Sequence, residues 1–188
     1  MIDKEDINTA LDTLRKGGVI LYPTDTIWGI GCDATNTEAV KRIYEIKQRA
    51  DSKSMLALVD GVAMLERYVE EIPDAAYQLI DVATTPLTII YDGAKGLATN
   101  LSAEDGSIGI RVTNEEFSKR LCQLFRRPIV STSANISGKP AAPTFAEIDD
   151  NIKNQVDYVV KYRQDDSNAA KPSNIIKVKA NGEFKIIR

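Results

Sequence analysis

The chain has 188 residues, of which 43% are hydrophobic and 27% are charged, a composition typical of one soluble globular domain with a real core. Its formal net charge of -3 disfavours a protein that coats nucleic acid by charge alone, although a local basic patch remains compatible with it. Histidine is absent, which excludes a Ser-His-Asp triad, a Cys-His pair and the common catalytic zinc sites. Any chemistry must therefore use Lys, Arg, Asp, Ser and Thr.

The first residues and the two cysteines bear on the compartment of the protein. Residues 1–6 are too acidic for a signal peptide, and no run of about 18 apolar residues is present, so we expect a cytoplasmic protein without membrane contact. Cys32 and Cys122 lie far apart in sequence and match neither a disulfide framework nor a paired-thiol metal site. We expect both to be small buried apolar side chains.

Hydrophobic periodicity predicts helices and strands that alternate through the first two thirds of the chain, with strands dominating the end. Helices are expected at about 4–16, 37–48, 61–69, 74–83 and 115–126. Strands are expected at 19–22, 55–59, 87–91, 107–112, 129–130, 158–161, 175–179 and 184–187. This order predicts an α/β fold with a mixed, twisted sheet in one domain over residues 1–188, with surface loops or lids at 93–106 and 163–172.

The loop after the first strand, Pro23-Thr24-Asp25-Thr26, places two hydroxyls and a carboxylate at the carboxyl end of a strand, where α/β sheets usually bind ligands. A turn in which these side chains bind only nearby backbone groups is equally compatible with the residues. Gly29, Gly31 and Ala34 also imitate a dinucleotide fingerprint, and Asp51 stands at the spacing of a ribose-binding acid. Residues 23–28 separate this motif from the strand end, which disfavours a Rossmann site.

Three cations, Lys47, Arg49 and Lys53, fall at a predicted helix end and the following loop. A solvated face that suits the helix dipole is the default interpretation of such a cluster. Ser52 and Ser54 are interleaved with the cations and could help them to bind polyphosphate, although the chain has no GxxxxGK[ST] loop.

A second polar segment, Ser131-Thr132-Ser133-Ala134-Asn135, follows the apolar pair Ile129-Val130. It reads either as a polar strand-to-loop turn or as a ligand-binding segment, and nucleophilic catalysis by its serines is disfavoured because no His or suitably spaced Lys is available. Arg111 is a lone charge in an apolar strand, and its partner could be an internal carboxylate or the carboxylate of a ligand.

Taken together, these segments resemble the single-domain YrdC/Sua5/YciO family, the threonylcarbamoyladenylate synthases, over nearly the whole chain. The matching motifs occur in order: PTDTIWG at 23–29, KQR at 47–49, SIGIR at 107–111, SAN at 133–135 and KPS at 171–173. The resemblance implies a YrdC-like (DHBP synthase-like) fold: one twisted sheet of parallel and antiparallel strands with flanking helices and a large concave cavity, here without the C-terminal Sua5 domain.

The resemblance also implies a reaction, in which L-threonine, bicarbonate and ATP give threonylcarbamoyl-AMP and pyrophosphate. Mg²⁺ would accompany ATP, with no tightly bound organic cofactor and no metal held by the protein alone. The product would pass to a separate threonylcarbamoyl transferase complex that modifies adenosine 37 of tRNA. The threonine-binding residues carried over by motif are Thr26, Arg111 and Ser131. Those for ATP are Lys47, Arg49, Lys53, Ser107, Ser133, Asn135, Ala141 and Ser173, of which Lys47, Arg49, Ser133 and Asn135 would be catalytic.

The chain departs from the family pattern in places, and two alternatives to the synthase stay open. Trp28 replaces a Tyr, and residues 84–88 (TTPLT) stand where many members have WPGPLT. One alternative is a YciO-type nucleotide-binding paralogue without synthase activity. The other is a protein that binds tRNA or double-stranded RNA through a basic concavity, to which Lys41 and Arg42 would add.

Overall fold

The structure is a computed structural model and describes residues 1–48 and 55–188. Within them one nine-stranded sheet has the strand order β7-β1-β2-β6-β3-β5-β4-β8-β9. The strands are β1 (Ile20–Tyr22), β2 (Gly29–Gly31), β3 (Leu56–Val59), β4 (Leu87–Tyr91), β5 (Ile108–Val112), β6 (Ile129–Ser133), β7 (Tyr158–Val159), β8 (Asn174–Val178) and β9 (Phe184–Ile186). The pairs β7-β1, β3-β5 and β4-β8 are parallel and the other five are antiparallel, which confirms the predicted mixed sheet.

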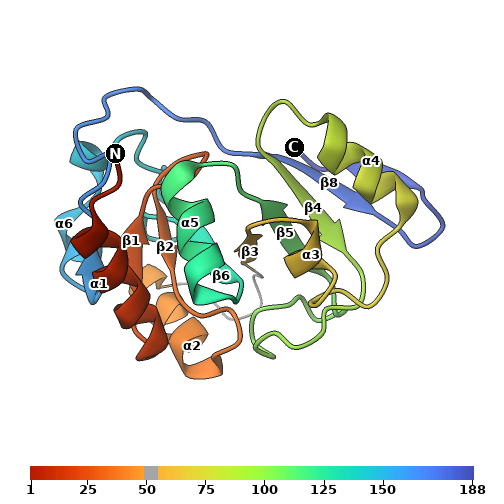
Figure 1. Cartoon of the computed structure of the whole chain (residues 1–188), viewed down its shortest axis with the longest axis horizontal. Coiled ribbons are helices and arrows are strands. Elements are labelled where there is room, and N and C mark those ends of the chain that lie inside the picture. The colour runs from red at the N-terminus through yellow and green to blue at the C-terminus, as the bar shows by residue number, and fades with distance from the viewer. Residues whose placement is uncertain (49–54) are drawn as a thin grey trace.

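The helices flank this sheet, and α1, α2, α3, α4 and α5 are seen in front of it in Figure 1. They are α1 (Lys4–Arg15), α2 (Thr37–Lys47), α3 (Val62–Leu65), α4 (Asp74–Val82), α5 (Glu116–Phe125), α6 (Asp150–Lys153) and the 3-10 turn η1 (Phe145–Glu147). None of the helices in the described ranges has the length and apolar character that a bilayer span requires.

Side chains that precede α1, α2 and α5 fix where these helices begin. Asp3, Asn36 and Glu115 each accept hydrogen bonds from two backbone N–H groups of the first turn, which would otherwise lack partners. The second helix ends where Gln48 adopts a left-handed conformation with φ of 50°. The caps make Lys47 the last residue of α2, and the backbone N–H of Ser137 donates to its carbonyl oxygen at 2.8 Å, which holds this helix end beside the segment after β6.

Two predicted segments differ from the structure in a way that affects the site. No helix or strand is predicted for residues 29–31, yet they form β2 between β1 and β6. Glycine is uncommon in strands, and at Gly31 it is required because a Cβ atom would lie 2.5 Å from Cε1 of Tyr22 and 2.6 Å from the carbonyl oxygen of Val130. Strand β6 also continues to Ser133, so Ser131 and Ser133 are strand residues and do not form a strand-to-loop turn.

The remaining differences are short elements, none of which contains a predicted site residue. The predicted helix at 61–69 is helical only at α3, and α6 and η1 occur in a segment for which no element was predicted. Each of the three has four residues or fewer, too short for periodicity to reveal.

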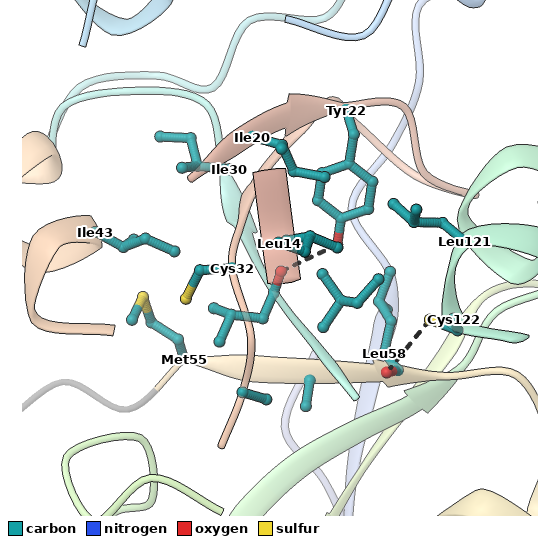
Figure 2. Close-up of a cluster of buried hydrophobic side chains, with 14 of the residues drawn as sticks. Leu14, Ile20, Tyr22, Ile30, Cys32, Ile43, Met55, Leu58, Leu121 and Cys122 are labelled. Atoms are coloured by element: carbon teal, nitrogen blue, oxygen red, sulfur yellow. Dashed lines mark hydrogen bonds between the residues drawn. The ribbon is translucent and has the colours of Figure 1, made fainter. Parts of the chain in front are cut away.

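The core lies between the sheet and α1, α2 and α5, and Figure 2 shows part of it. The Tyr22 hydroxyl donates a 3.0 Å hydrogen bond to the carbonyl oxygen of Val130, which satisfies the one polar atom of a fully buried ring. Cys32 and Cys122 are fully buried free thiols, as predicted, and burial raises the pKa of both well above the ordinary thiol value. They are therefore packing residues and not reactive thiols.

Candidate active site

A cavity of about 420 Å³ opens on the sheet beside the loop that follows β1. Most of the predicted site residues line it. These are Thr26, Arg111, Ser131, Ser133, Asn135, Ala141 and Ser173. The segments around Thr26 and Ser133, which are more than 100 positions apart in sequence, therefore meet at one site, as the motifs predicted.

Strand register orders the polar groups along this cavity. Leu58 pairs with Arg111, and two residues earlier Leu56 pairs with both Gly109 and Ser131. Residues paired across strands share a face of the sheet, and a two-residue step along a strand is about 7 Å. Arg111 therefore lies about 7 Å along the sheet from the row of Ser131, and Ser133 lies one further step in the same direction.

The loop 23–27 is ordered by one threonine and presents another. Thr24 Oγ1 donates to the carbonyl oxygen of Ile27 at 2.8 Å and accepts from the backbone N–H of Thr26 at 3.1 Å. Because a hydroxyl has one proton, the 3.0 Å contact between the two threonine hydroxyls must use the proton of Thr26. The Thr26 oxygen is thereby left as an acceptor, and Arg111 Nη2 donates to it at 3.2 Å.

Arg111 is 2% exposed and stands at the inner end of the cavity. Besides Thr26, it contacts Thr88 Oγ1 at 3.4 Å from Nη1 and Asp25 Oδ1 at 2.9 Å from Nη2. Of the two partners that its sequence position left open, an internal carboxylate is thus present. The contact with Asp25 is close but lacks hydrogen-bond geometry, since Asp25 Oδ1 has no hydrogen-bond partner, and Arg111 Nε has none either.

Burial dominates the electrostatics of Asp25. Its side chain is 12% exposed, and burial raises the pKa of the carboxyl above the ordinary 3.8, an effect that exceeds the opposing attraction of Arg111. Burial thus disfavours the charged carboxylate even though Arg111 lies beside it.

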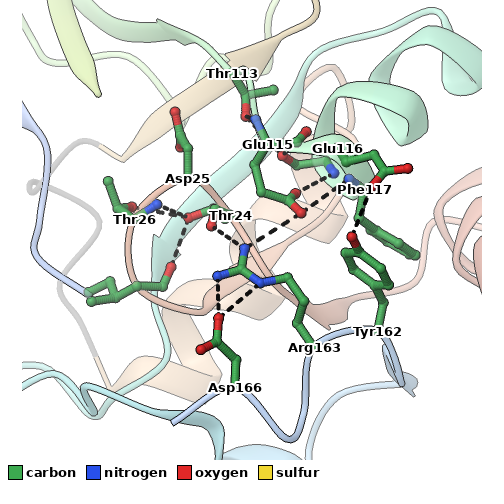
Figure 3. A network of polar contacts seen from close by, with 12 residues as sticks. Thr24, Asp25, Thr26, Thr113, Glu115, Glu116, Phe117, Tyr162, Arg163 and Asp166 are labelled. Atoms are coloured by element: carbon green, nitrogen blue, oxygen red, sulfur yellow. Dashed lines mark hydrogen bonds and ion pairs between the residues drawn. The ribbon is translucent and has the colours of Figure 1, made fainter. Parts of the chain in front are cut away.

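An arginine from the C-terminal third of the chain fixes the backbone of the same loop (Figure 3). Arg163 donates to the carbonyl oxygen of Thr24 at 3.3 Å and to Asp166 Oδ2 at 2.8 Å, and it lies 3.6 Å from Glu115 Oε1. Glu115 in turn caps α5. This network joins the loop to the start of a helix and so holds Thr26 at the cavity.

Lys47 lies behind the opposite end of the cavity and is 1% exposed. Its ammonium group donates to the carbonyl oxygens of Ser133 and Asn135, at 2.5 and 2.7 Å. In this arrangement Lys47 shapes the end of β6 and the loop that follows it. Asn135 Nδ2 donates to the carbonyl oxygens of Ile136 and Lys139, which leaves Asn135 Oδ1 buried without a hydrogen-bond partner.

Of the predicted ATP-binding residues that the structure describes, Lys47 and Ser107 do not line the cavity. Ser107 is buried and donates its hydroxyl proton to Asp105 Oδ1 at 2.6 Å, just before β5 begins. Arg49 and Lys53 lie outside the described residues.

Four further residues belong to the site and were not among those predicted for it. Asp25 and Thr88 surround Arg111, and the Thr88 hydroxyl also contacts Ser173 Oγ at 2.8 Å. Lys139 and Arg188 line the cavity and give it positive charge. Asp25 and Thr88 could have been found from the sequence because a charged Arg111 in an apolar strand needs polar partners. The strand pairing that brings the end of the chain to Ile175 gives no comparable sequence signal for Arg188.

The described residues contain no group of three or more His, Cys, Asp or Glu side chains arranged to hold a metal ion. The described lining of the cavity likewise has no Asp or Glu side chain. Mg²⁺ prefers oxygen ligands and keeps several waters, so in this cavity it would have to be bound through the oxygens of a phosphate ligand.

Comparison with known proteins places this geometry in a family. The Sua5/YciO/YrdC family model, described as "Telomere recombination", matches residues 12–188. The chain belongs to the Sua5/YciO/YrdC family. Threonylcarbamoyl-AMP synthases are similar to it: that of Pseudoalteromonas translucida is 37% identical over 163 residues, which cover 85% of this chain and 87% of the relative. That of Vibrio cholerae is 36% identical over 84% of this chain and 85% of the relative.

Solved structures confirm the YrdC-like fold. A variant of P. abyssi Sua5 superposes with a TM-score of 0.88 at 25% identity and covers 100% of this chain and 57% of its own. E. coli YciO superposes with a TM-score of 0.85 at 26% identity and covers 99% of this chain and 89% of its own. A complex of P. abyssi Sua5 with L-threonine has the same fold, with a TM-score of 0.88 at 24% identity, and covers 100% of this chain and 55% of its own.

Proposed function

We propose that this protein is an L-threonylcarbamoyladenylate synthase, which makes threonylcarbamoyl-AMP and pyrophosphate from L-threonine, bicarbonate and ATP. The observation that carries the proposal is a pair of unsatisfied polar atoms at two ends of one cavity. Arg111 Nε and Asn135 Oδ1 are both buried without a hydrogen-bond partner. Buried polar groups rarely stay unpaired in a protein, so each is a natural contact for a ligand.

The end of the cavity near Arg111 suits an amino acid. The guanidinium group has donors directed at a carboxylate, and Thr26 is held beside it by Thr24. Ser131 stands about 7 Å along the sheet, close to where the substituents of a bound threonine would reach. Arg111, Thr26 and Ser131 would therefore bind and orient threonine.

The end of the cavity near Ser133 suits the nucleotide. It gathers the Ser133 hydroxyl, the Asn135 amide and the cations of Lys139 and Arg188, with Ala141 and Ser173 in the same wall. Attack of the threonine carbamate on the α-phosphate brings anions together, and fixed cations and hydrogen-bond donors stabilise the charge that develops. Lys47 would act there by positioning Ser133 and Asn135, and Arg49, Lys53 and Ser107 complete the proposed set.

The reaction needs no nucleophile from the protein, which agrees with the absence of histidine. Mg²⁺ would enter with ATP and neutralise phosphate charge. The product would be consumed by a separate threonylcarbamoyl transferase complex that modifies tRNA. The synthase names of relatives at 36 and 37% identity favour this activity over that of a YciO-type paralogue.

The test is pyrophosphate release in the presence of ATP, Mg²⁺ and bicarbonate, with and without L-threonine. Release that depends on threonine supports a synthase. Binding of ATP without any threonine-dependent release would contradict the proposal and support a YciO-type protein. Binding of RNA that weakens steeply with salt, again without turnover, would support the RNA-binding alternative.

A further inference from the structure

Asp25 contacts Arg111 from outside the lining of the first cavity, and the mechanism above gives it no role. The 2.9 Å contact between Asp25 Oδ1 and Arg111 Nη2 brings two opposite charges together in a largely buried place. Asp25 Oδ1 and Arg111 Nε nevertheless both lack a hydrogen-bond partner. In a salt bridge with a purely structural role, these two atoms should have hydrogen-bond partners, because a buried charge without hydrogen bonds destabilises the fold.

The side chain of Asp25 is held much less firmly than the backbone around it. Thr24 and Thr26 bind each other, and Arg163 binds the carbonyl oxygen of Thr24, so the turn is fixed on both sides of Asp25. In Figure 3 the Asp25 carboxylate points away from Arg163 and Asp166, and no bond joins it to that network. Rotation of this one side chain would therefore leave the loop intact.

Space is available for such a rotation. Asp25 also lines a second cavity of about 380 Å³, between the opposite face of the sheet and the region of α4. Ile110 and Val112 line that cavity, whereas Arg111 between them lines the first, so β5 separates the two. Glu115, the other carboxylate of the second cavity, is occupied by the cap of α5 and by Arg163. Asp25 can thus draw back from Arg111 without repacking the core.

An amino acid is a zwitterion, and its carboxylate and ammonium group match Arg111 and Asp25, each of which has an atom without a hydrogen-bond partner. We propose that the substrate inserts into the Asp25–Arg111 pair, with its carboxylate on Arg111 and its α-ammonium group on Asp25. Asp25 is then a specificity-determining residue: it selects ligands that carry an ammonium group and, without one, it competes with their carboxylate for Arg111. This inference rests on the proposed function, since it takes L-threonine as the amino acid.

The test compares two ligands that differ only in the ammonium group, L-threonine and (R)-3-hydroxybutyrate. Affinities of both are measured by calorimetry for the wild-type protein, for Asp25→Asn and for the control Asp92→Asn, a surface carboxylate that pairs with Lys177. Asp25→Asn removes the charge and keeps the size. The affinity for threonine should fall at least about tenfold, as expected for loss of a charge-assisted contact. The affinity for (R)-3-hydroxybutyrate should stay unchanged or rise.

The opposite responses of the two ligands separate recognition from a structural effect. If Asp25→Asn lowers the affinity for both ligands by the same factor, or leaves the affinity for threonine unchanged, the inference is wrong. Unchanged ATP affinity and a cooperative thermal unfolding transition of Asp25→Asn establish that the variant is folded. If the wild-type protein neither binds threonine nor releases pyrophosphate in response to it, the proposed function fails and the inference fails with it. Failure of the inference alone leaves threonine-dependent release by the wild-type protein intact.

Discussion

The Nζ atom of Lys47 lies 2.5 Å from the carbonyl oxygen of Ser133, and this hydrogen bond ties the end of α2 to the end of β6. A second bond, of 2.7 Å, joins the same ammonium group to the carbonyl oxygen of Asn135. The two segments that the motifs single out for nucleotide binding are therefore connected through the protein itself. Lys47 can influence the phosphate end of the cavity by shaping its wall.

Replacing Lys47 with Met should reduce both stability and turnover. Each lost bond from a charged donor to a buried carbonyl contributes about 1.5–3 kcal/mol, so the free energy of unfolding should fall by about 3 kcal/mol. The affinity for ATP should weaken as Ser133 and Asn135 lose their positions, and threonine affinity should change little. Chemical denaturation and calorimetry measure these quantities. Lys41→Met, an exposed position of the same helix, is the matched control. Unchanged stability and ATP affinity in Lys47→Met would remove this positioning role.

Arg111 and Asp25 should show strong coupling in a double-mutant cycle. Arg111→Gln leaves the buried Asp25 carboxylate without its counter-charge and should lower the free energy of unfolding by about 3 kcal/mol at neutral pH. The double variant Arg111→Gln with Asp25→Asn should recover most of that loss, because no charge remains buried. Urea denaturation of the four proteins gives the coupling energy. Additive effects of the two changes would show that the pair does not interact. Both proteins that lack Arg111 should lose threonine-dependent turnover by about a hundredfold or more.

The pKa of Asp25 predicts an unusual dependence of stability on pH. Because burial raises this pKa, the folded protein holds more protons at Asp25 than the unfolded chain does between the ordinary carboxyl pKa of 3.8 and the raised value. The contribution of Asp25 to the free energy of unfolding therefore falls as pH rises through that interval, by at most about 1.4 kcal/mol per pH unit. Asp25→Asn lacks this loss. Its stability relative to the wild-type protein should rise as the pH is raised from about 4. A difference that stays constant, or that falls, would contradict the raised pKa.

Alanine substitutions at the two glycines of β2 should have different effects, one on stability and the other on ligand binding. A Cβ atom at Gly31 would meet Tyr22 and the Val130 carbonyl at 2.5 and 2.6 Å, so Gly31→Ala should cost about 2–3 kcal/mol of stability. At Gly29, which lines the cavity, a Cβ atom would lie 3.1 Å from Ser131 Oγ. Gly29→Ala should therefore cost less than about 1 kcal/mol and yet raise the KM for threonine. Thermal unfolding measures the stability of both variants, and steady-state kinetics measures their KM for threonine. A Gly29→Ala variant less stable than Gly31→Ala would contradict this prediction.

Motifs and periodicity predicted a large part of this molecule. The helices α1, α2 and α5 were identified because each buries a periodic apolar face, whereas α4, also identified, has only Ala76 buried. Most strands were identified from short apolar runs. The family resemblance predicted that the loop around Thr26, Arg111 and the segment 131–135 meet, and residues of all three line one cavity.

What the sequence did not reveal depends on contacts between distant segments. The three residues of β2 are held by pairing with β1 and β6, which overrides the weak strand propensity of glycine. The charge of Lys47 suggested a direct phosphate contact, whereas its burial against two carbonyl oxygens is a tertiary feature. For the same reason Arg188 could not be recognised: only the pairing of the chain end with β8 brings it to the cavity.

The most direct test of the proposed synthase activity is the mass of the nucleotide product formed from ATP, L-threonine and ¹³C-labelled bicarbonate. A synthase should give an adduct of AMP and threonine that contains one labelled carbon, and omission of threonine should abolish it. Arg111→Gln should give little of this product under the same conditions. A nucleotide fraction in which the wild-type protein leaves only ATP, or gives AMP without the labelled threonine adduct, would contradict the proposed function.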